Sequence, residues 1–356
     1  MNRDNIEKVR DGLYHAGNTL IFLPPDPWPE EIRKALIIIT FSILGTYTRL
    51  GLTDLTNYAG SYVQGPNVLW PNFTACFCMG LVQGLNKYKV IPSSLFGGLT
   101  TGYAGTASSF SSLMMELFNH STAQNSANIS MDIKFPNQAY GILEFLSVLT
   151  VELGVSICGL VLGYHVAREL GKYMEEEKGM PSELSINLSS FLDGVEAAAI
   201  ALALPFVIVQ VVLAAVYSNF SRSWTLSAVF GIFGTLARYY ISRWYNIIYP
   251  HFPLGTFIVN VGASMLLAVF ELLIRGKLAD GTMIIKSVNT SRVVGALGTG
   301  LCGAMSTIST FVNEGYQLPL KPVSLYYFVS IFISYSLFIV ILGSYTWTRG
   351  LANPIS

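Results

Sequence analysis

The sequence predicts an all-α polytopic membrane protein in which two antiparallel four-helix repeats are joined by one linking transmembrane helix, nine spans in all. First, 52% of its 356 residues are hydrophobic and 12% are charged, with a mean hydropathy of +0.50. Soluble domains carry about 25% charged residues. Second, nine apolar windows have roughly the 20 residues that a bilayer-spanning helix needs. Third, three short motifs occur twice in the same order.

The nine apolar windows are separated by polar segments and are expected to be helices. They lie near 35–53, 68–85, 92–117, 139–165, 196–218, 225–246, 252–274, 291–316 and 323–347. A chain in hydrocarbon must pair its backbone groups internally, and no alternating pattern of a β-barrel is present. The polar N-terminus has no apolar core of a secretory signal, so the first span is expected to start membrane insertion.

Polar segments divide the chain into five expected parts. These are an N-terminal segment 1–34, a first repeat 35–167, a polar linker 168–194, a linking transmembrane helix 195–218 and a second repeat 219–356. The linker contains the charged run Glu175–Lys178, which is typical of a connection between two halves. A hydrophilic loop at 118–138 holds glycosylation sequons at Asn119 and Asn128, which suit an extracellular position.

An internal duplication relates the two halves of the chain. The segment Phe41–Arg49 aligns with Phe230–Arg238, Asn72 aligns with Asn260, and Thr101–Glu116 aligns with Thr299–Glu314. Membrane carriers and channels are commonly built by such duplication. Because the linking helix crosses the membrane once between the copies, the second copy is expected to be upside down relative to the first.

The distribution of basic residues favours a cytoplasmic N-terminus. In that orientation twelve Lys and Arg residues fall in inside loops and seven in outside loops. The basic loop between Arg275 and Arg292 opposes this assignment, because it would lie outside. The totals of 21 basic and 21 acidic residues leave no basic excess, so nucleic acid is not expected as a partner.

Two arginines, Arg49 and Arg238, lie inside apolar windows at equivalent places in the repeat. A charge within the membrane is costly unless it faces water or a partner. Both are therefore expected to point away from lipid. They either line an electropositive anion vestibule or have a structural role at a helix interface.

The third helix of each repeat is expected to be broken. The segments Phe96–Phe110 and Gly295–Ser309 mix glycine with hydroxyl residues, which weakens a helix and lets backbones approach closely. Carbonyls at two such breaks could form an oxygen cage for a small cation. Tight helix packing without an ion is the alternative, and the residues alone leave both open.

These motifs together resemble the signature of the Fluc/FEX family of fluoride channels. The resemblance is carried by Gly-x-x-x-Arg at Gly45–Arg49, by Val259-Asn260 and by Gly303–Glu314 in the third helix of the second repeat. The duplicated form is similar to the eukaryotic, chiefly fungal, FEX branch. The resemblance implies that the lipid-embedded chain works as a monomer, an internal pseudo-dimer in which two inverted units form two narrow fluoride pathways.

In the family each pathway is lined by one phenylalanine from each unit. By position, one pathway keeps Phe110 with Phe311, and the other is degenerate because it has Ile308 with Leu113. Phenyl edges carry partial positive charge and can replace part of the hydration shell of fluoride, which aliphatic side chains cannot do. Ordinary interchange of core residues is the alternative interpretation.

The resemblance also implies a polar track on the fourth helix. Tyr326, Ser330 and Ser334 share one helical face, and the first copy is expected to place Tyr140, Glu144 and Val148 at the corresponding positions. The carboxylate would repel an anion. Hydroxyl ladders also serve helix packing in membranes, which is the alternative.

Further residues are implied by their positions in the family motifs. Asn72 and Asn260 would present amide donors to the fluoride pathway, and Glu116 and Glu314 are expected to cap a helix or form a structural ion pair. The backbone carbonyls of Gly105, Ser108, Gly303 and Ser306 would hold a structural sodium ion. No other cofactor is implied.

The implied function is passive and highly selective fluoride export across the plasma membrane, which protects the cell from fluoride toxicity. A negative interior drives an anion outward by about 2.3 kcal/mol per 100 mV, so no energy source is required. A secondary transporter of a small anion is the main alternative, since inverted repeats also build carriers. An enzyme is not expected, because the four histidines form no repeated acid–base pair.

Overall fold

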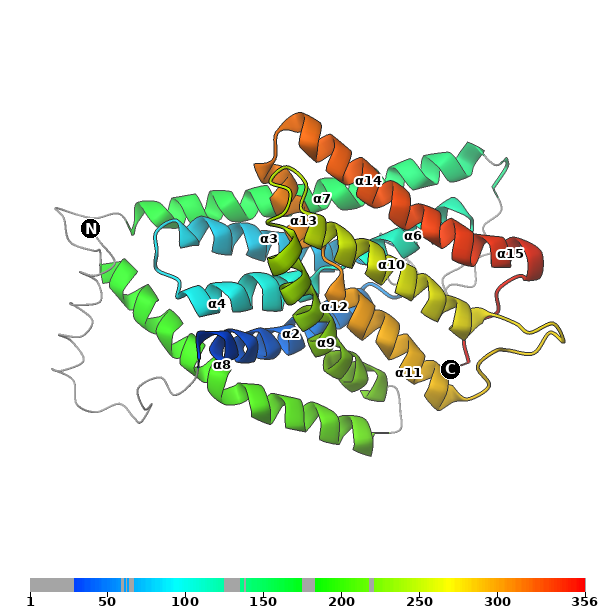
Figure 1. Ribbon diagram of the computed structural model, residues 1–356, viewed down its shortest axis with the longest axis horizontal. Coiled ribbons are helices and arrows are strands. Elements are labelled where there is room, and N and C mark those ends of the chain that lie inside the picture. Colours follow the sequence, from blue (N-terminus) through cyan, green and yellow to red (C-terminus); the bar gives the residue numbers. More distant parts are fainter. Residues whose placement is uncertain are drawn as a thin grey trace.

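The chain is an all-helical, multi-span membrane protein. The computed structural model describes residues 29–58, 61, 63, 67–124, 135–137, 139–174, 183–217 and 221–355. Within these ranges the regular elements are helices, together with one isolated bridge between Lys277 and Met283 (Figure 1). Six helical segments of the described chain are long and apolar enough to cross a membrane.

Each repeat contributes the same order of helices. The first repeat contains α2 (Glu30–Leu55), α3 (Leu69–Asn86), α4 (Ser93–Gly97), η1 (Gly98–Ala104), α5 (Gly105–Ala107), α6 (Phe110–Ser121) and α7 (Ala139–Lys172). The second contains α9 (Ser221–Tyr245), α10 (Leu254–Arg275), α11 (Val288–Ala296), η2 (Leu297–Cys302), α12 (Gly303–Met305), α13 (Ile308–Gln317), α14 (Leu320–Phe338), η3 (Ile339–Gly343) and α15 (Ser344–Arg349). Between them runs α8 (Glu183–Val216).

Each of the nine apolar windows coincides with a helical segment, but the linking helix is longer than predicted. It begins at Glu183, where the sequence suggested a polar linker up to residue 194, and α7 continues to Lys172. Both helices extend beyond their apolar windows into polar turns, which a search for apolar windows does not detect. The run Glu175–Lys178 and the sequon at Asn128 lie outside the described residues, and Asn119 lies in the last turn of α6.

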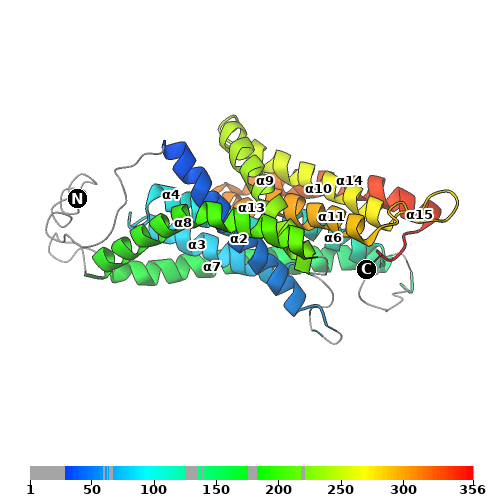
Figure 2. The same cartoon turned by 90° about the horizontal axis from the view of Figure 1, so that it is seen from below.

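The linking helix α8 packs along the outer side of α2 and α9. Figure 1 shows α7 and α8 on opposite sides of the bundle, and Figure 2 shows α8 crossing α2. The hydroxyl of Thr40 donates a 2.7 Å hydrogen bond to the carbonyl of Ala199, and Arg33 forms a 2.8 Å ion pair with Glu196. These contacts attach the linking helix to the first repeat.

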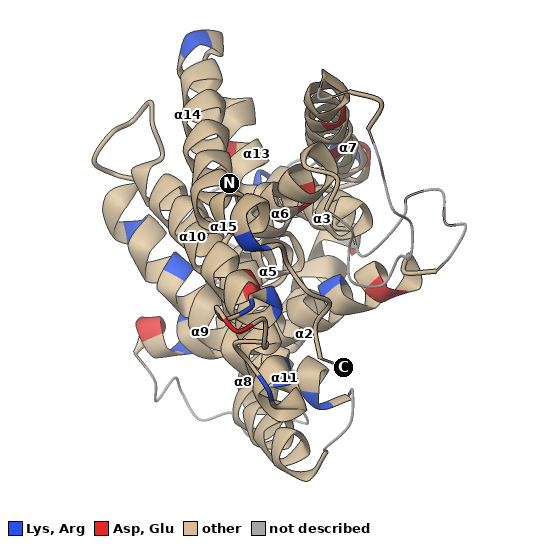
Figure 3. Ribbon diagram, turned by 90° about the vertical axis from the view of Figure 1, so that its right-hand side faces the viewer, with Lys and Arg blue, Asp and Glu red and all other residues tan. Residues whose placement is uncertain are grey.

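The outer surface of the bundle is largely apolar. Charged residues are sparse along the helices (Figure 3). Large apolar side chains such as Leu204, Phe328 and Phe332 are about 60% exposed or more along α8 and α14. An outward apolar face of this kind is the surface that contacts lipid in a polytopic protein.

Candidate functional site

The third helix of each repeat is interrupted by two residues in extended conformation. Ser108 (φ −92°, ψ 155°) and Ser109 (φ −145°, ψ 115°) separate α5 from α6. Ser306 (φ −85°, ψ 156°) and Thr307 (φ −152°, ψ 130°) separate α12 from α13. All four residues are fully buried. Buried backbone outside a helix needs other partners, so the surroundings of the breaks determine what they can bind.

The equivalent asparagines of the two second helices, Asn72 and Asn260, bind the backbone at these breaks. The side-chain oxygen of Asn72 accepts a 2.9 Å hydrogen bond from the Ser109 amide, and that of Asn260 accepts a 2.8 Å bond from the Thr307 amide. In a continuous helix these amides would bond to the carbonyls four residues earlier, those of Gly105 and Gly303. The asparagines therefore leave without their helical partners two of the carbonyls that the family resemblance assigns to a sodium ion.

The N-cap residues of α6 and α13 leave the other two carbonyls, those of Ser108 and Ser306, without their helical partners. The Ser109 hydroxyl accepts a 3.2 Å bond from the Ser112 amide, and the Thr307 hydroxyl accepts a 3.2 Å bond from the Thr310 amide. In a continuous helix those amides would bond to the carbonyls of residues 108 and 306. All four predicted carbonyls thus lose their helical partners, which fits the oxygen ligands that a hard cation prefers.

The two breaks face each other across the repeat interface. The Ser108 hydroxyl accepts a 3.1 Å bond from the Ser309 amide, and the Ser306 hydroxyl accepts a 3.0 Å bond from the Ser111 amide. Each repeat therefore makes the same contact with the other. This reciprocity is what a twofold relation between two copies of one unit produces.

The two intramembrane arginines also reach across this interface. Arg49 donates a 2.6 Å hydrogen bond to the carbonyl of Thr299, and Arg238 donates a 2.8 Å bond to the carbonyl of Thr101. Arg238 also donates to the carbonyl of Ala304 at 3.0 Å. Both side chains are at most 4% exposed, and among the described residues neither forms an ion pair. They point away from lipid, and their contacts support the structural alternative.

Glycines make room for these guanidinium groups. A Cβ atom on Gly303 would collide with the guanidinium of Arg49, and one on Gly105 would collide with that of Arg238. The last glycine before each break therefore leaves the space that the arginine of the partner repeat occupies.

An aromatic cluster lies next to the breaks. The rings of Phe110 and Phe311 are 5.1 Å apart with an interplanar angle of 62°, an edge-to-face contact. Phe311 also contacts Tyr326, with centroids 4.8 Å apart, and stacks on Tyr327 at 4.5 Å. Phe110, Phe311 and Tyr326 are fully buried. The two phenylalanines, one from each repeat, are thus brought together.

A hydrogen-bond network continues from this cluster through Glu314. Its carboxylate accepts bonds from the hydroxyls of Tyr326 at 2.9 Å and Thr256 at 2.7 Å, and from the Asn246 amide at 2.9 Å. Among the residues that the structure describes, Glu314 therefore forms neither the cap nor the ion pair that the sequence suggested. Glu116 is a cap, because it accepts a 2.6 Å bond from the Val68 amide where α3 begins.

Ser330 and Ser334 continue along the face of α14 that carries Tyr326. Both are fully buried, and their hydroxyl oxygens have no hydrogen-bond partner in the described part of the chain. They are therefore available as donors. The face presents three hydroxyls in a row.

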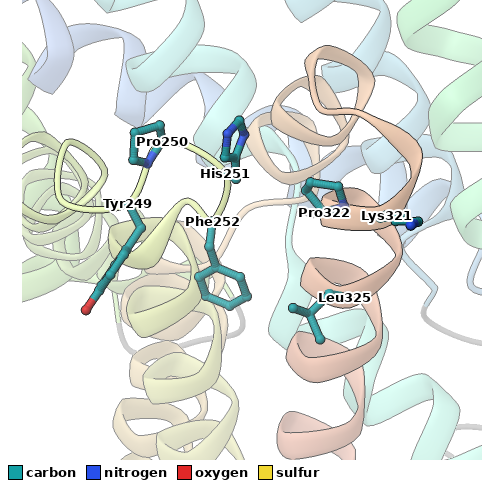
Figure 4. Close-up of a pocket in the computed structure, with 7 residues that line it drawn as sticks. All are labelled: Tyr249, Pro250, His251, Phe252, Lys321, Pro322 and Leu325. Atoms are coloured by element: carbon teal, nitrogen blue, oxygen red, sulfur yellow. The ribbon is translucent and has the colours of Figure 1, made fainter.

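An open groove of about 430 Å³ adjoins the tyrosine end of this row. Figure 4 shows the groove residues, with the Phe252 ring between the start of α10 and the start of α14. The groove is lined by Tyr249, Pro250, His251, Phe252, Lys321, Pro322 and Leu325. Phe252 packs edge-to-face on Tyr326 at 5.3 Å, so the groove wall touches the aromatic cluster.

The corresponding region of the first repeat differs from the prediction. Ile308 and Leu113 are buried in the same core cluster as the phenylalanines. Tyr140 is 45% exposed, however, and Glu144 lies at the surface 3.7 Å from His120. The predicted alignment of the fourth helices was therefore wrong, because these residues belong to the exposed first turns of the long helix α7.

Contacts between helices give the correct alignment. Tyr164 stacks on Tyr316 across the interface, and Phe338 makes a tilted contact with Phe118 at the equivalent place. Phe118 and Tyr316 are equivalent under the offset of 198 residues between the third helices, so their partners Phe338 and Tyr164 are equivalent too. The offset between the two fourth helices is therefore 338 − 164 = 174 residues. Under this offset, the residues of α7 equivalent to Tyr326, Ser330 and Ser334 are Glu152, Ser156 and Leu160, and all three are buried. An acidic residue amid an apolar window is the signal that could have identified Glu152 from sequence.

The fold and the paired breaks define a membrane protein built from two copies of one helical unit. A family model described as CrcB-like protein, Camphor Resistance (CrcB), matches the chain twice, at residues 36–164 and 225–344. The chain therefore belongs to the CrcB family and has two CrcB repeats.

Similar proteins within this family include fungal and bacterial members. Fluoride export protein 1 of Saccharomyces cerevisiae is 43% identical, covering 89% of this chain and 94% of the relative. Fluoride export protein 1 of Candida albicans is 36% identical, covering 89% and 80%. Fluoride-specific ion channel FluC 2 of Moorella thermoacetica is 39% identical, covering 26% of this chain and 67% of the relative. No solved structure is significantly similar to the chain.

Proposed function

We propose that the chain is a passive fluoride channel of the plasma membrane with one conducting pathway. The observation that carries this proposal is the contact of Phe110 with Phe311 beside a buried row of hydroxyls on α14. Ring edges carry partial positive charge and hydroxyls donate hydrogen bonds, so together they can replace the water around a small anion. Names of the relatives, fluoride export protein and fluoride-specific ion channel, agree with this chemistry.

The proposed pathway passes the ring pair, follows Tyr326, Ser330 and Ser334, and opens near the groove beside Phe252. Asn260 lies on the same repeat, where both ends of its amide bond to Thr307. Its role in this proposal is to hold the break, which positions the aromatic cluster. Ser330 and Ser334 would offer fluoride hydroxyl donors of no net charge, so it would be bound without being trapped, whereas the Tyr326 hydroxyl already donates its proton to Glu314.

The four released carbonyls support a structural sodium ion between the repeats. Gly105, Ser108, Gly303 and Ser306 would supply oxygen ligands to it. An ion there would neutralise the carbonyl dipoles that meet at the repeat interface. In this proposal the ion has a structural role, and fluoride does not bind to it during conduction.

Fluoride efflux from liposomes tests the proposed function. Vesicles containing the purified protein are loaded with potassium fluoride, and valinomycin is added so that potassium can leave with the anion. Fluoride should leave at equal pH and equal sodium on both sides, whereas chloride should be retained. Efflux that required a proton or sodium gradient would instead indicate a secondary transporter.

We propose nine spans, two opposed repeats and a cytoplasmic N-terminus, and surface labelling tests this arrangement. Lys87 and Lys89 lie after α3, and Lys277 and Lys286 lie between α10 and α11. A membrane-impermeant amine reagent added to sealed, oriented vesicles should modify only one of these two pairs. The other pair should react after permeabilisation. Modification of both pairs from one side would show that the repeats are parallel.

A further inference from the structure

The two buried arginines differ in how well their donors are used. Arg238 donates to two backbone carbonyls of the third helices and, at 3.3 Å, to the hydroxyl of Thr106. In the part of the chain that the structure describes, Arg49 makes one hydrogen bond, to the carbonyl of Thr299 at 2.6 Å, and its Nη1 atom is buried without a partner. A guanidinium group has five N–H donors, so Arg49 retains capacity for a further acceptor.

One difference between the repeats removes a partner from Arg49. Thr106 and Ala304 are equivalent under the 198-residue offset between the third helices. The Thr106 hydroxyl bridges Arg238 and Thr235, which is 2.7 Å away. Ala304 has no hydroxyl, so no such bridge reaches Arg49. The Arg49 side of the interface also lacks the two heavy atoms by which threonine exceeds alanine.

The positive charge of these arginines has no acidic partner nearby. Among the described residues neither Arg49 nor Arg238 forms an ion pair, and the carboxylates that follow the breaks, Glu116 and Glu314, accept hydrogen bonds from other groups. Arginine stays protonated in proteins, and a buried charge without a counter-ion is costly. The sodium ion proposed between the repeats would add a further positive charge. A water molecule would satisfy the free donor only, whereas an anion would also offset the charge.

We propose that Arg49 binds a monovalent halide ion at the repeat interface, on the side where Ala304 stands in place of a threonine. The Nη1 donor would hold the ion by a charge-assisted hydrogen bond, and the ion would offset the buried positive charge. Fluoride and chloride share this chemistry, and measurements in the two salts tell them apart. The proposal is drawn from the contacts of the arginines and does not depend on which route conducts.

Thermal unfolding in matched sodium salts tests the site. The detergent-solubilised protein is kept at constant sodium concentration and ionic strength, and millimolar chloride or fluoride replaces part of a gluconate background. Gluconate is too large for a buried site. Because a bound ion stabilises the folded state, at least one halide should raise the transition temperature by about 2 °C or more. Equal transition temperatures in all three salts would overturn the proposal.

A matched pair of substitutions separates the site from general effects of salt. Ala304→Ser supplies the hydroxyl that Arg238 receives from Thr106, so it should remove at least half of the halide-dependent shift. Thr106→Ala takes that hydroxyl from Arg238 and should enlarge the shift, because both arginines then lack it. An unchanged shift in Ala304→Ser, or a smaller shift in Thr106→Ala, would contradict a site at Arg49.

Phe311→Ile separates this site from the proposed pathway. Fluoride bound along the pathway would also stabilise the protein, and that contribution should fall in this variant. The part of the shift that Ala304→Ser removes should be the same with Phe311 or isoleucine at this position. If Phe311→Ile abolished that part, the shift would report on the pathway, and the separate site at Arg49 would be ruled out.

Discussion

Phe311→Ile is expected to slow fluoride efflux at least about tenfold, which corresponds to ~1.4 kcal/mol in the barrier. Phe311 contacts Phe110 from the other repeat and two tyrosines of α14, Tyr326 and Tyr327. An isoleucine fills much of the same space but offers no positive ring edge to the anion. The measurement is fluoride release from liposomes at equal protein density.

Leu113→Ala is the matched control for this prediction. Leu113 is 1% exposed in the same core cluster, and truncating a buried leucine typically costs 2–5 kcal/mol of stability. The control therefore also disturbs the packing of the core. We expect it to change efflux by less than about twofold, because Leu113 belongs to the pathway that is expected to be degenerate. Equal losses in both variants would remove the hypothesis of one conducting pathway.

The duplication could be predicted from sequence because its motifs combine residue types with special backbone or charge requirements. Arg49 and Arg238 stand out in apolar windows, and Gly105 and Gly303 are needed where these arginines approach. Such residues fix an alignment to a single position. The interrupted third helices follow from the same glycine and hydroxyl content.

The fourth helices offered no marker that occurs in both copies. Most positions of α7 are apolar and interchangeable, so a hydroxyl periodicity could be matched about three turns away from its true counterpart. Only the contacts of Tyr164 and Phe338 with the partner repeat fix the alignment. The incorrect alignment therefore assigned the exposed Glu144 to the position that the buried Glu152 occupies.

The roles of the two asparagines also depended on geometry. An asparagine side chain can both donate and accept hydrogen bonds, and the family resemblance implied that its NH₂ group donates to fluoride. In the structure the acceptor end of each amide holds the amide of a break residue. This contact links the second helix of each repeat to the carbonyls assigned to sodium, and it leads to a test of the ion.

Asn260→Leu is expected to abolish at least half of any stabilisation of the protein by sodium. Without the side-chain oxygen, the Thr307 amide either stays unpaired, which costs about 1–3 kcal/mol, or bonds to the carbonyl of Gly303. The second outcome makes the helix continuous and removes one of the four ligands. The measurement is the thermal transition of the detergent-solubilised protein in sodium and in N-methylglucamine chloride.

Asn313→Leu provides the comparison that separates ion binding from general instability. Asn313 is also a buried asparagine that accepts a hydrogen bond, 2.8 Å from the Tyr164 hydroxyl, but it lies away from the breaks. It should lower the transition temperature in both salts and leave the difference between them unchanged. Asn72→Leu should behave like Asn260→Leu, since Asn72 holds the first break. A full sodium response in both break variants would mean that these carbonyls do not bind the ion.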